Sequence, residues 1–171
     1  MRIYIVGSVA SGKSTLARRV SEKAGIPCYH LDEVMRVADP TAKPWGNRKR
    51  PEEEIERLFK EALAGEYVME DNGRERFLEG MQRADQVVLL DIPLIIRYWR
   101  IVSRWIKQRL GIEACIYTPG WRMLTNMFRW ARSFDTGTDG VRERIKPFAG
   151  KTVVLRTKRD IRAYVEGLCA R

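Results

Sequence analysis

The sequence predicts an α/β fold in which a parallel sheet lies between two layers of helices. Apolar, strand-like runs alternate with helical periodicities along all 171 residues, which is the pattern of consecutive strand–helix–strand units. Residues 87–90 form a continuous apolar run, typical of a strand that is buried on both faces of a parallel sheet. We find no internal repeat, low-complexity tract or linker, so the pattern predicts a single domain over residues 1–171.

The first predicted strand and helix flank a glycine-rich loop. The strand is predicted from the β-branched run at residues 3–6, and the helix from apolar residues that recur at helical spacing from Leu16 onward. Between them stands Gly7-x-x-x-x-Gly12-Lys13-Ser14, the complete Walker A pattern. Its glycines let successive backbone N–H groups face one concave site, and the helix adds the positive end of its dipole.

This loop predicts that the chain binds a nucleoside triphosphate; a plain Gly/Ser turn is the alternative. Lys13 is expected to reach the β- and γ-phosphates, and the Ser14 hydroxyl is expected to bind Mg²⁺. The residues expected to hold the nucleotide at this loop are Gly7, Ser11, Gly12, Lys13, Ser14 and Thr15.

The alternation of strands and helices continues through the first half of the chain. Pro51, followed by three glutamates, predicts a helix start, and Gly65 predicts its end. Residues 36–50, which include Lys43-Pro44-Trp45-Gly46, are expected to form a polar loop. A short helix carrying Arg74 and Arg76 is expected next. The further strands expected in this half are residues 27–31, 67–69 and 87–91.

Two amphipathic helices are expected after residue 93, over about 93–110 and 121–134. On a helical wheel both show an apolar stripe opposite a basic one, and the apolar stripes predict core packing. The apolar sets are Ile95, Trp99, Val102, Ile106 and Leu110 in the first helix, and Met123, Met127, Ala131 and Phe134 in the second. The basic sets are Arg97, Arg100 and Arg104, and then Arg122, Arg129 and Arg132. A helix to about 148, a strand at 152–155 and a helix from about 158 complete the chain.

Carboxylates follow three of the predicted strands, at the end where parallel sheets bind ligands. Asp32 follows the second strand, where a carboxylate orients Mg²⁺ or accepts a proton from an attacking hydroxyl; a helix N-cap is the alternative. Glu70-Asp71-Asn72 follows the third strand and is a candidate for substrate contact or for indirect support of Mg²⁺. Asp91 ends the fourth apolar run in the Walker B form, which predicts a metal ligand.

Basic residues are concentrated in one segment of this chain, whose formal net charge is +10. Between Arg97 and Arg132 there are seven arginines and one lysine, against the single acid Glu113. Arginine forks bind phosphate oxygens in two-point contacts and neutralise charge on a phosphoryl group in transfer. We therefore predict a catalytic lid over about residues 97–132; a solvated basic face and a nucleic-acid patch are the alternatives.

The composition also bears on location. No apolar run approaches the roughly 20 residues of a membrane span, and the chain begins directly with a predicted strand, which predicts no signal peptide. Cys28, Cys115 and Cys169 are too few and too far apart for a disulfide framework, so a cytoplasmic protein is expected. His30, the single histidine, cannot build a histidine-rich metal site.

On these residues the sequence resembles the adenylate-kinase-like P-loop proteins and, more narrowly, the family of DNA-topology modulation proteins, also called topology modulation kinases. The resemblance extends over nearly the whole chain, and it implies a P-loop NTPase three-layer sandwich with a five-stranded parallel sheet in the order 2-3-1-4-5 and a mobile lid. Related chains commonly have Asp-Gly-Asn where this chain has Glu70-Asp71-Asn72. The motifs that carry the resemblance are residues 7–17, 29–32, 70–72 and 90–93 and the arginine-bearing helix after them.

The resemblance further implies that Arg100, Arg104 and Arg109 stand where the lid begins and that Arg142 contacts phosphate. The leading hypothesis is a kinase that transfers the γ-phosphoryl group of Mg-ATP to an unidentified small molecule or nucleotide. Its catalytic residues are then Lys13, Asp32, Arg100 and Arg104, and its metal ligands Ser14, Asp32 and Asp91. Its acceptor side is the loop at about 36–50 with Glu70, Asn72, Arg74 and Arg76.

Two alternatives to a kinase remain open. Thr157-Lys158-Arg159-Asp160 loosely matches a guanine-reading pattern, which would indicate a GTPase-like switch. The arginines of residues 97–132 would also suit a nucleic-acid-linked ATPase or a DNA-binding module, although no DNA-reading motif is present.

Overall fold

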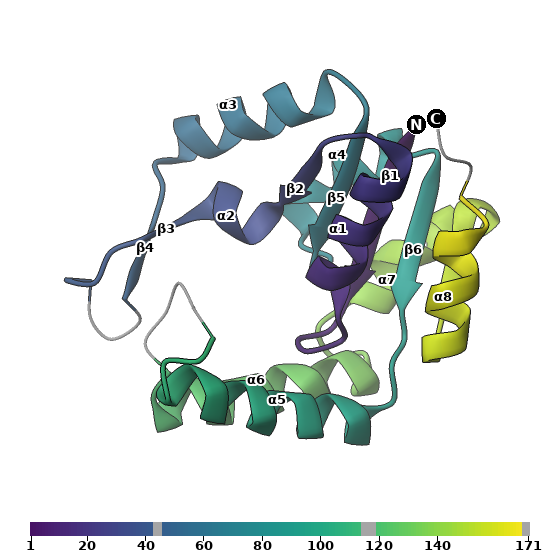
Figure 1. Cartoon of the computed structure of the whole chain (residues 1–171). Coiled ribbons are helices and arrows are strands. Elements are labelled where there is room, and N and C mark those ends of the chain that lie inside the picture. Colours follow the sequence, from purple (N-terminus) through teal and green to yellow (C-terminus); the bar gives the residue numbers. More distant parts are fainter. Residues whose placement is uncertain (43–45, 114–118, 169–171) are drawn as a thin grey trace.

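The computed structural model describes residues 1–42, 46–113 and 119–168. Within these ranges five parallel strands form one sheet, in the order β2-β5-β1-β6-β7 (Figure 1). Counted along the chain, the strands of this sheet stand in the order 2-3-1-4-5, so the predicted fold class and strand order are confirmed. The strands are β1 (Arg2–Gly7), β2 (Cys28–His30), β5 (Tyr67–Asp71), β6 (Gln86–Leu90) and β7 (Thr152–Leu155).

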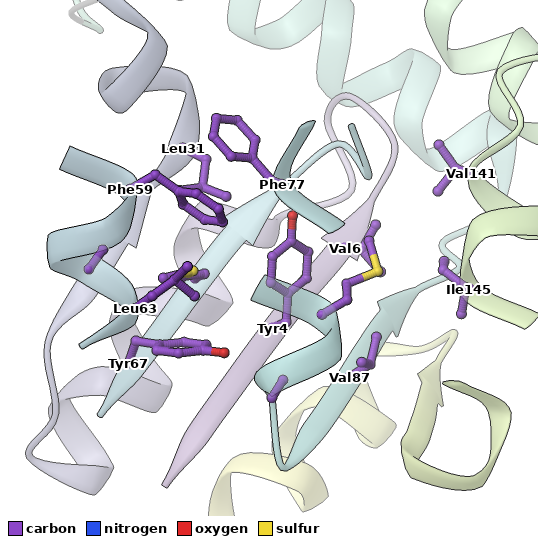
Figure 2. Close-up of a cluster of buried hydrophobic side chains, with 14 of the residues drawn as sticks. Tyr4, Val6, Leu31, Phe59, Leu63, Tyr67, Phe77, Val87, Val141 and Ile145 are labelled. Atoms are coloured by element: carbon purple, nitrogen blue, oxygen red, sulfur yellow. The ribbon is translucent and has the colours of Figure 1, made fainter. Parts of the chain in front are cut away.

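Helices cover both faces of the sheet because its strands are apolar on both sides. In β1, Ile3 and Ile5 face α1 (Lys13–Ala24) and α8 (Lys158–Glu166), with Leu16, Val20 and Val165 in the same core cluster. Tyr4 and Val6 point to the opposite face, where α3 (Glu52–Leu63), α4 (Leu78–Arg83) and α7 (Val141–Ile145) pack. Figure 2 shows this second cluster, in which Phe59 and Phe77 stack with ring centroids 4.9 Å apart. The two-residue alternation of β1 therefore supplies both cores.

The segment expected as a polar loop at 36–50 contains a small antiparallel ribbon, formed by β3 (Arg36–Ala38) and β4 (Asn47–Lys49). It follows the short helix α2 (Leu31–Met35) and projects from the body of the molecule (Figure 1). Its strands carry mostly polar side chains, so they lack the apolar alternation that predicts a strand. Residues 43–45 lie outside the described ranges, as do Cys115 and Cys169.

Helices α5 (Leu94–Arg109) and α6 (Trp121–Thr136) lie side by side beyond the carboxyl ends of the strands (Figure 1). Their shared core contains Ile101, Met123 and Met127. The predicted stripe of α6 is buried, as expected. The interpretation of α5 was wrong, because Arg97 is 1% exposed whereas Ile95 and Trp99 are 64% and 72% exposed.

Satisfied hydrogen bonds explain the buried arginine of α5. Arg97 Nε donates to the Ile92 carbonyl at 2.8 Å, Nη1 donates to the Ala131 carbonyl at 2.9 Å, and Nη2 pairs with Asp135. A guanidinium whose donors are matched in this way is tolerated in an interior position. A helical wheel shows two stripes, but it does not show which one faces the protein.

Several element boundaries differ from the prediction. Asp32 lies inside the first turn of α2, and Glu70 and Asp71 belong to β5 itself. Two 3₁₀ helices, η1 (Glu75–Phe77) and η2 (Lys146–Lys151), occupy parts of the expected helices. No helix within the described ranges has the length and apolar character needed to cross a bilayer.

Candidate active site

The Walker loop turns sharply between β1 and α1. Gly12 has φ +101°, a left-handed conformation that glycine adopts without strain. Gly7 needs its missing side chain for a different reason, since a Cβ there would lie 2.8 Å from the Leu90 carbonyl oxygen. The hydroxyl oxygens of Ser8 and Ser11 are buried and have no hydrogen-bond partner among the described residues. Unpaired polar atoms in a glycine-rich turn fit a loop built to surround an anion.

Lys13 holds its ammonium group close to this loop. The side chain is buried, and Nζ donates to the Ser8 carbonyl at 3.1 Å and to Asn72 Oδ1 at 2.9 Å. Both acceptors are neutral, so neither cancels the charge of the lysine. The structure therefore brings Asn72 to Lys13 and leaves the ammonium charge available to a phosphate.

Ser14 is linked to β5 through a carboxylate. Its Oγ donates to Glu70 Oε1 at 2.8 Å, and His30 Nδ1 lies 3.0 Å from the same oxygen. Burial by itself raises the pKa of Glu70, but the His30 hydrogen bond and the Lys13 charge lower this pKa to about 2. Contacts with the Cys28 sulfur and with Glu70 raise the pKa of His30 to about 10. Glu70 is therefore ionised at neutral pH beside the Walker serine.

These oxygens suit a magnesium ion. Mg²⁺ prefers oxygen ligands and is usually bound through one or two carboxylates together with substrate phosphates. The Ser14 hydroxyl and the Glu70 carboxylate supply such a set next to the phosphate loop. Asp32, the second predicted ligand, lines the same cleft, but one of its oxygens pairs with Arg74.

Arg74 joins Asp32 to β5. Its Nη2 pairs with Asp32 Oδ1, and its Nη1 lies 2.5 Å from Asp71 Oδ1. Burial tends to lower the pKa of Arg74, but the two carboxylates raise it above its ordinary value. Asp32 is thus held at the carboxyl end of the sheet by a guanidinium that lies between two acids.

Asp91 does not meet Ser14, contrary to the prediction. Arg142 Nη2 donates to Asp91 Oδ1 at 2.7 Å, and Arg156 Nε donates to Asp91 Oδ2 at 3.3 Å. Neither Asp91 nor Arg142 lines the cleft that contains the Walker loop. Burial alone would raise the pKa of Asp91, but the two arginines keep it below its ordinary value. The structure therefore gives the Walker B-like aspartate an ion-pairing role.

The predicted arginines of residues 97–132 have different positions. Arg100 Nη1 donates to the Ser11 carbonyl at 2.7 Å and so touches the Walker loop directly. Arg104 lines the cleft and pairs with Glu113 at 2.9 Å. Arg109 lies over the Trp105 ring, 5.3 Å from its centroid, outside the cleft. Arg76, expected on the acceptor side, instead pairs with Glu52 of α3 at 2.7 Å.

Lys13, Ser14, Asp32, Glu70 and Arg100 line one cleft of about 1320 Å³. Thr15 lines it as expected, and so does Lys158 of the loosely guanine-reading pattern. Arg18, Trp130 and Arg144, which the sequence did not single out, line it too. Arg144 Nε donates to the Gly73 carbonyl at 2.8 Å. Arg142 and Arg144 are two residues apart on a helix, so their side chains point about 200° apart. The resemblance assigned the phosphate contact to Arg142, but Arg144 is the one that lines the cleft.

Comparisons with known proteins point to kinases. The chain is 32% identical to adenylate kinase 2 of Synechocystis over 100 residues, which are 55% of this chain and 55% of that protein. It is 31% identical to the shikimate kinase of Aquifex aeolicus over 102 residues, which are 54% of this chain and 61% of that protein. The match thus spans little more than half the length of these curated relatives.

The structural comparison gives the fold. The Acinetobacter baumannii shikimate kinase structure, solved in complex with shikimate, matches with a TM-score of 0.57 and 17% identity, over 96% of this chain and 88% of that one. No family model matches the sequence. The chain therefore has the P-loop NTPase α/β fold, and its resemblance to DNA-topology modulation proteins stays a prediction.

Proposed function

We propose that this protein is a kinase that transfers the γ-phosphoryl group of Mg-ATP to a small acceptor. The observation that carries the proposal is the shared cleft. Its lining includes the Walker lysine Lys13, the loop-contacting Arg100 and the carboxylate of Asp32. The groups that would bind the phosphates and the carboxylate that would accept the acceptor's proton line the same cleft, as direct transfer requires. The similarity to an adenylate kinase and a shikimate kinase supports the same reaction class.

Different groups of the protein bind the phosphates, stabilise the developing charge and would hold the metal ion. The loop N–H groups and Lys13 Nζ bind the β- and γ-phosphate oxygens. Arg100 and Arg104 stabilise the charge that develops on the phosphoryl group in transfer. Ser14 and Glu70 would hold Mg²⁺, which would supply positive charge to neutralise the phosphates.

Asp32 acts on the acceptor. Its ion pair with Arg74 fixes one carboxylate oxygen, and the other orients the acceptor hydroxyl and accepts its proton. An acceptor that already carried a phosphate oxygen as nucleophile would need no such base. The ribbon β3–β4 and Arg74 are the acceptor side of the proposed site, and α5 with α6 forms the lid.

The motif behind the GTPase-like alternative, residues 157–160, lies at the start of α8. The Asp160 carboxylate accepts hydrogen bonds from the backbone N–H groups of Arg156 and Thr157, each at 2.9 Å, in a capping box at the start of α8. Asp160 thus has a structural role at the start of α8, which explains this residue without a guanine ligand. We therefore expect ATP rather than GTP as the phosphoryl donor.

A nucleic-acid-linked ATPase is the second candidate, and one observation favours it. Arg129 and Arg132 are exposed on α6 and do not line the cleft. Binding through such a face would weaken steeply with salt. If DNA rather than any small acceptor stimulated ADP release, this candidate would replace the kinase.

The test is MgATP-dependent ADP release with and without pooled acceptors, including nucleosides, nucleoside monophosphates and sugar acids. Lys13→Ala serves as the blank. We expect stimulation by one pool that is absent in the blank and lost in the Arg100→Ala/Arg104→Ala double variant. The double variant should still bind ATP, because Lys13 and the loop remain. Wild-type turnover in that variant would overturn the lid assignment.

A further inference from the structure

The charges that line the cleft differ between its two ends. The end next to the Walker loop is strongly basic, as a triphosphate requires. Among the described residues that line this end, six side chains are basic, and the acids are Glu113 and Glu70, whose carboxylate accepts a hydrogen bond from Ser14. The basic residues are Lys13, Arg18, Arg100, Arg104, Lys107 and Lys158.

The other end, which we call the acceptor end, is lined from α2, the ribbon β3–β4, the end of β5 and α7. Its charges balance, and its cations already have partners. Arg74 lies between Asp32 and Asp71. The remaining lining residues that carry charge at this end are Glu33, Arg36, Asp139 and Arg144.

The guanidinium of Arg144 is also engaged. Its Nε donates to the Gly73 carbonyl at 2.8 Å and its Nη2 to the Asp139 carbonyl at 2.7 Å. Arg36 Nη1 donates to Asn47 Oδ1 at 2.8 Å within the ribbon. The Arg74 charge is matched by two carboxylates, and the Arg144 fork is occupied by two carbonyls, so a second phosphate or a carboxylate placed here would have to compete with existing hydrogen bonds for its guanidinium contacts.

Helices α5 and α6 add apolar side chains to the lining of the same cleft. Helix α6 contributes Met123, Met127, Trp130 and Phe134 to the lining, and α5 contributes Ile96 and Trp99. Trp130 is 51% exposed although it lines the cleft. When a flat apolar molecule covers an exposed indole ring, apolar surface is removed from water, and this favours binding.

We propose that the acceptor is an uncharged molecule with a flat ring on one side and hydroxyl groups on the other, as in a nucleoside, and that Trp130 selects it by stacking on the ring. This inference rests on the proposed function, because it names the second substrate of that reaction. The ring lies against α6, and the hydroxyl edge faces Asp32 and Asn72.

The transfer balances with these groups alone. The acceptor hydroxyl oxygen forms a bond to the γ-phosphorus, and the bond from that phosphorus to the β,γ-bridging oxygen breaks. ADP leaves with the electron pair of the broken bond. The hydroxyl proton passes to the free oxygen of Asp32 and from there to solvent.

The experiment measures ADP release by the full chain at saturating MgATP with single acceptors. Adenosine and thymidine represent nucleosides, their 5′-monophosphates represent phosphate acceptors, and gluconate represents a sugar acid. We expect a nucleoside to stimulate release above the other probes. Stronger stimulation by a monophosphate or by gluconate would overturn the inference while leaving a kinase in place.

A pair of tryptophan variants tests the stacking contact. Trp130→Ala should raise the KM for the nucleoside by roughly 5- to 150-fold, the range for losing one base–aromatic stack, with the KM for ATP unchanged. Trp130→Phe should recover most of that loss. Trp121→Ala is the matched control, because Trp121 is exposed on the same helix but packs on Trp105 outside the cleft.

The failure of this inference is distinguishable from failure of the proposed function. If Trp130→Ala and Trp121→Ala have equal nucleoside KM values, Trp130 does not select the acceptor. Saturable MgATP binding that depends on Lys13, without stimulation by either nucleoside, overturns the acceptor class alone. Absence of MgATP binding itself would overturn the proposed function.

Discussion

The Glu70 carboxylate accepts hydrogen bonds from side chains of two different elements, Ser14 of α1 and His30 of β2. One oxygen atom thus connects the phosphate loop to the edge strand of the sheet. Asp71, the next residue, faces the other side of β5 and binds Arg74. Because strand side chains alternate, these two consecutive acids serve two different parts of the site.

The His30–Glu70 pair makes a prediction about stability and pH. The pKa of Glu70 falls from 4.5 to about 2, so its contribution is present above pH 4.5 and is lost as the pH falls through 2. The pKa of His30 rises from 6.5 to about 10, so its contribution is complete below pH 6.5 and is lost as the pH rises through 10. Both contributions are therefore complete only between about pH 4.5 and 6.5.

We expect His30→Gln to lower the free energy of unfolding by about 2 kcal/mol at pH 5.5, as for other hydrogen bonds to a charged group. The difference from wild type should shrink as the pH approaches 10. Urea unfolding in metal-free buffer at a series of pH values measures it. A difference that stayed constant from pH 5 to 10 would contradict the ion pair.

The same region shows what the sequence could and could not predict at this scale. The Walker residues were identifiable because a fixed spacing encodes the turn itself. The carboxylate that contacts Ser14 was not, because acids stand at the end of β5 and directly after β6, and both strands flank β1. The pattern favoured Asp91 for its longer apolar run, whereas Glu70 is the residue whose side chain reaches Ser14.

At the scale of elements, α5 is the helix whose orientation the sequence did not predict. Its length and position were predictable from periodicity, but its orientation was not, because the buried stripe includes Arg97. Two of the acceptors that satisfy this arginine, the Ala131 carbonyl and Asp135, are 34 and 38 residues away from it in the sequence. The ribbon β3–β4 was missed for a related reason, since its polar strands carry no signal of their own.

Replacing Arg97 should destabilise the α5–α6 pair. Arg97→Met keeps an apolar stem of similar length but leaves Asp135 and two carbonyls without their donor. We expect the free energy of unfolding to fall by about 3 kcal/mol, as when one partner of a buried ion pair is removed. Urea unfolding measures this change.

Arg132→Met is the matched control, because Arg132 is exposed on α6. Such a surface substitution should change stability by no more than about 0.5 kcal/mol. Equal losses for the two variants would contradict the role assigned to Arg97 in holding α5 against α6 and the end of β6.

At the scale of the whole molecule, the net charge of +10 is accounted for in large part by one place. Six basic residues from α1, α5 and α8 line the Walker end of the cleft, among the parts of the chain that the structure describes. A basic lining next to a phosphate loop accounts for part of this charge. The acceptor end, by contrast, combines balanced charges with an apolar wall from α5 and α6.

The strand order was predictable because alternating strands and helices permit few sheets, and the resemblance to P-loop proteins selected one of them. The contents of the cleft were less predictable. Trp130 reads in the sequence as one more aromatic of an amphipathic helix, and only the fold shows that it lines the same cleft as Asp32 and Arg74. Sites assembled from distant segments become visible when the fold brings those segments together.

The most direct measurement follows the γ-phosphoryl group itself. Full-length protein is incubated with Mg-ATP labelled at the γ-phosphorus, with and without a nucleoside acceptor, and the labelled products are separated. We predict label on the organic acceptor, dependent on that acceptor and abolished by Lys13→Ala. Label found only in inorganic phosphate, whatever the acceptor and with Lys13 intact, would contradict a phosphotransferase and leave a nucleotide hydrolase.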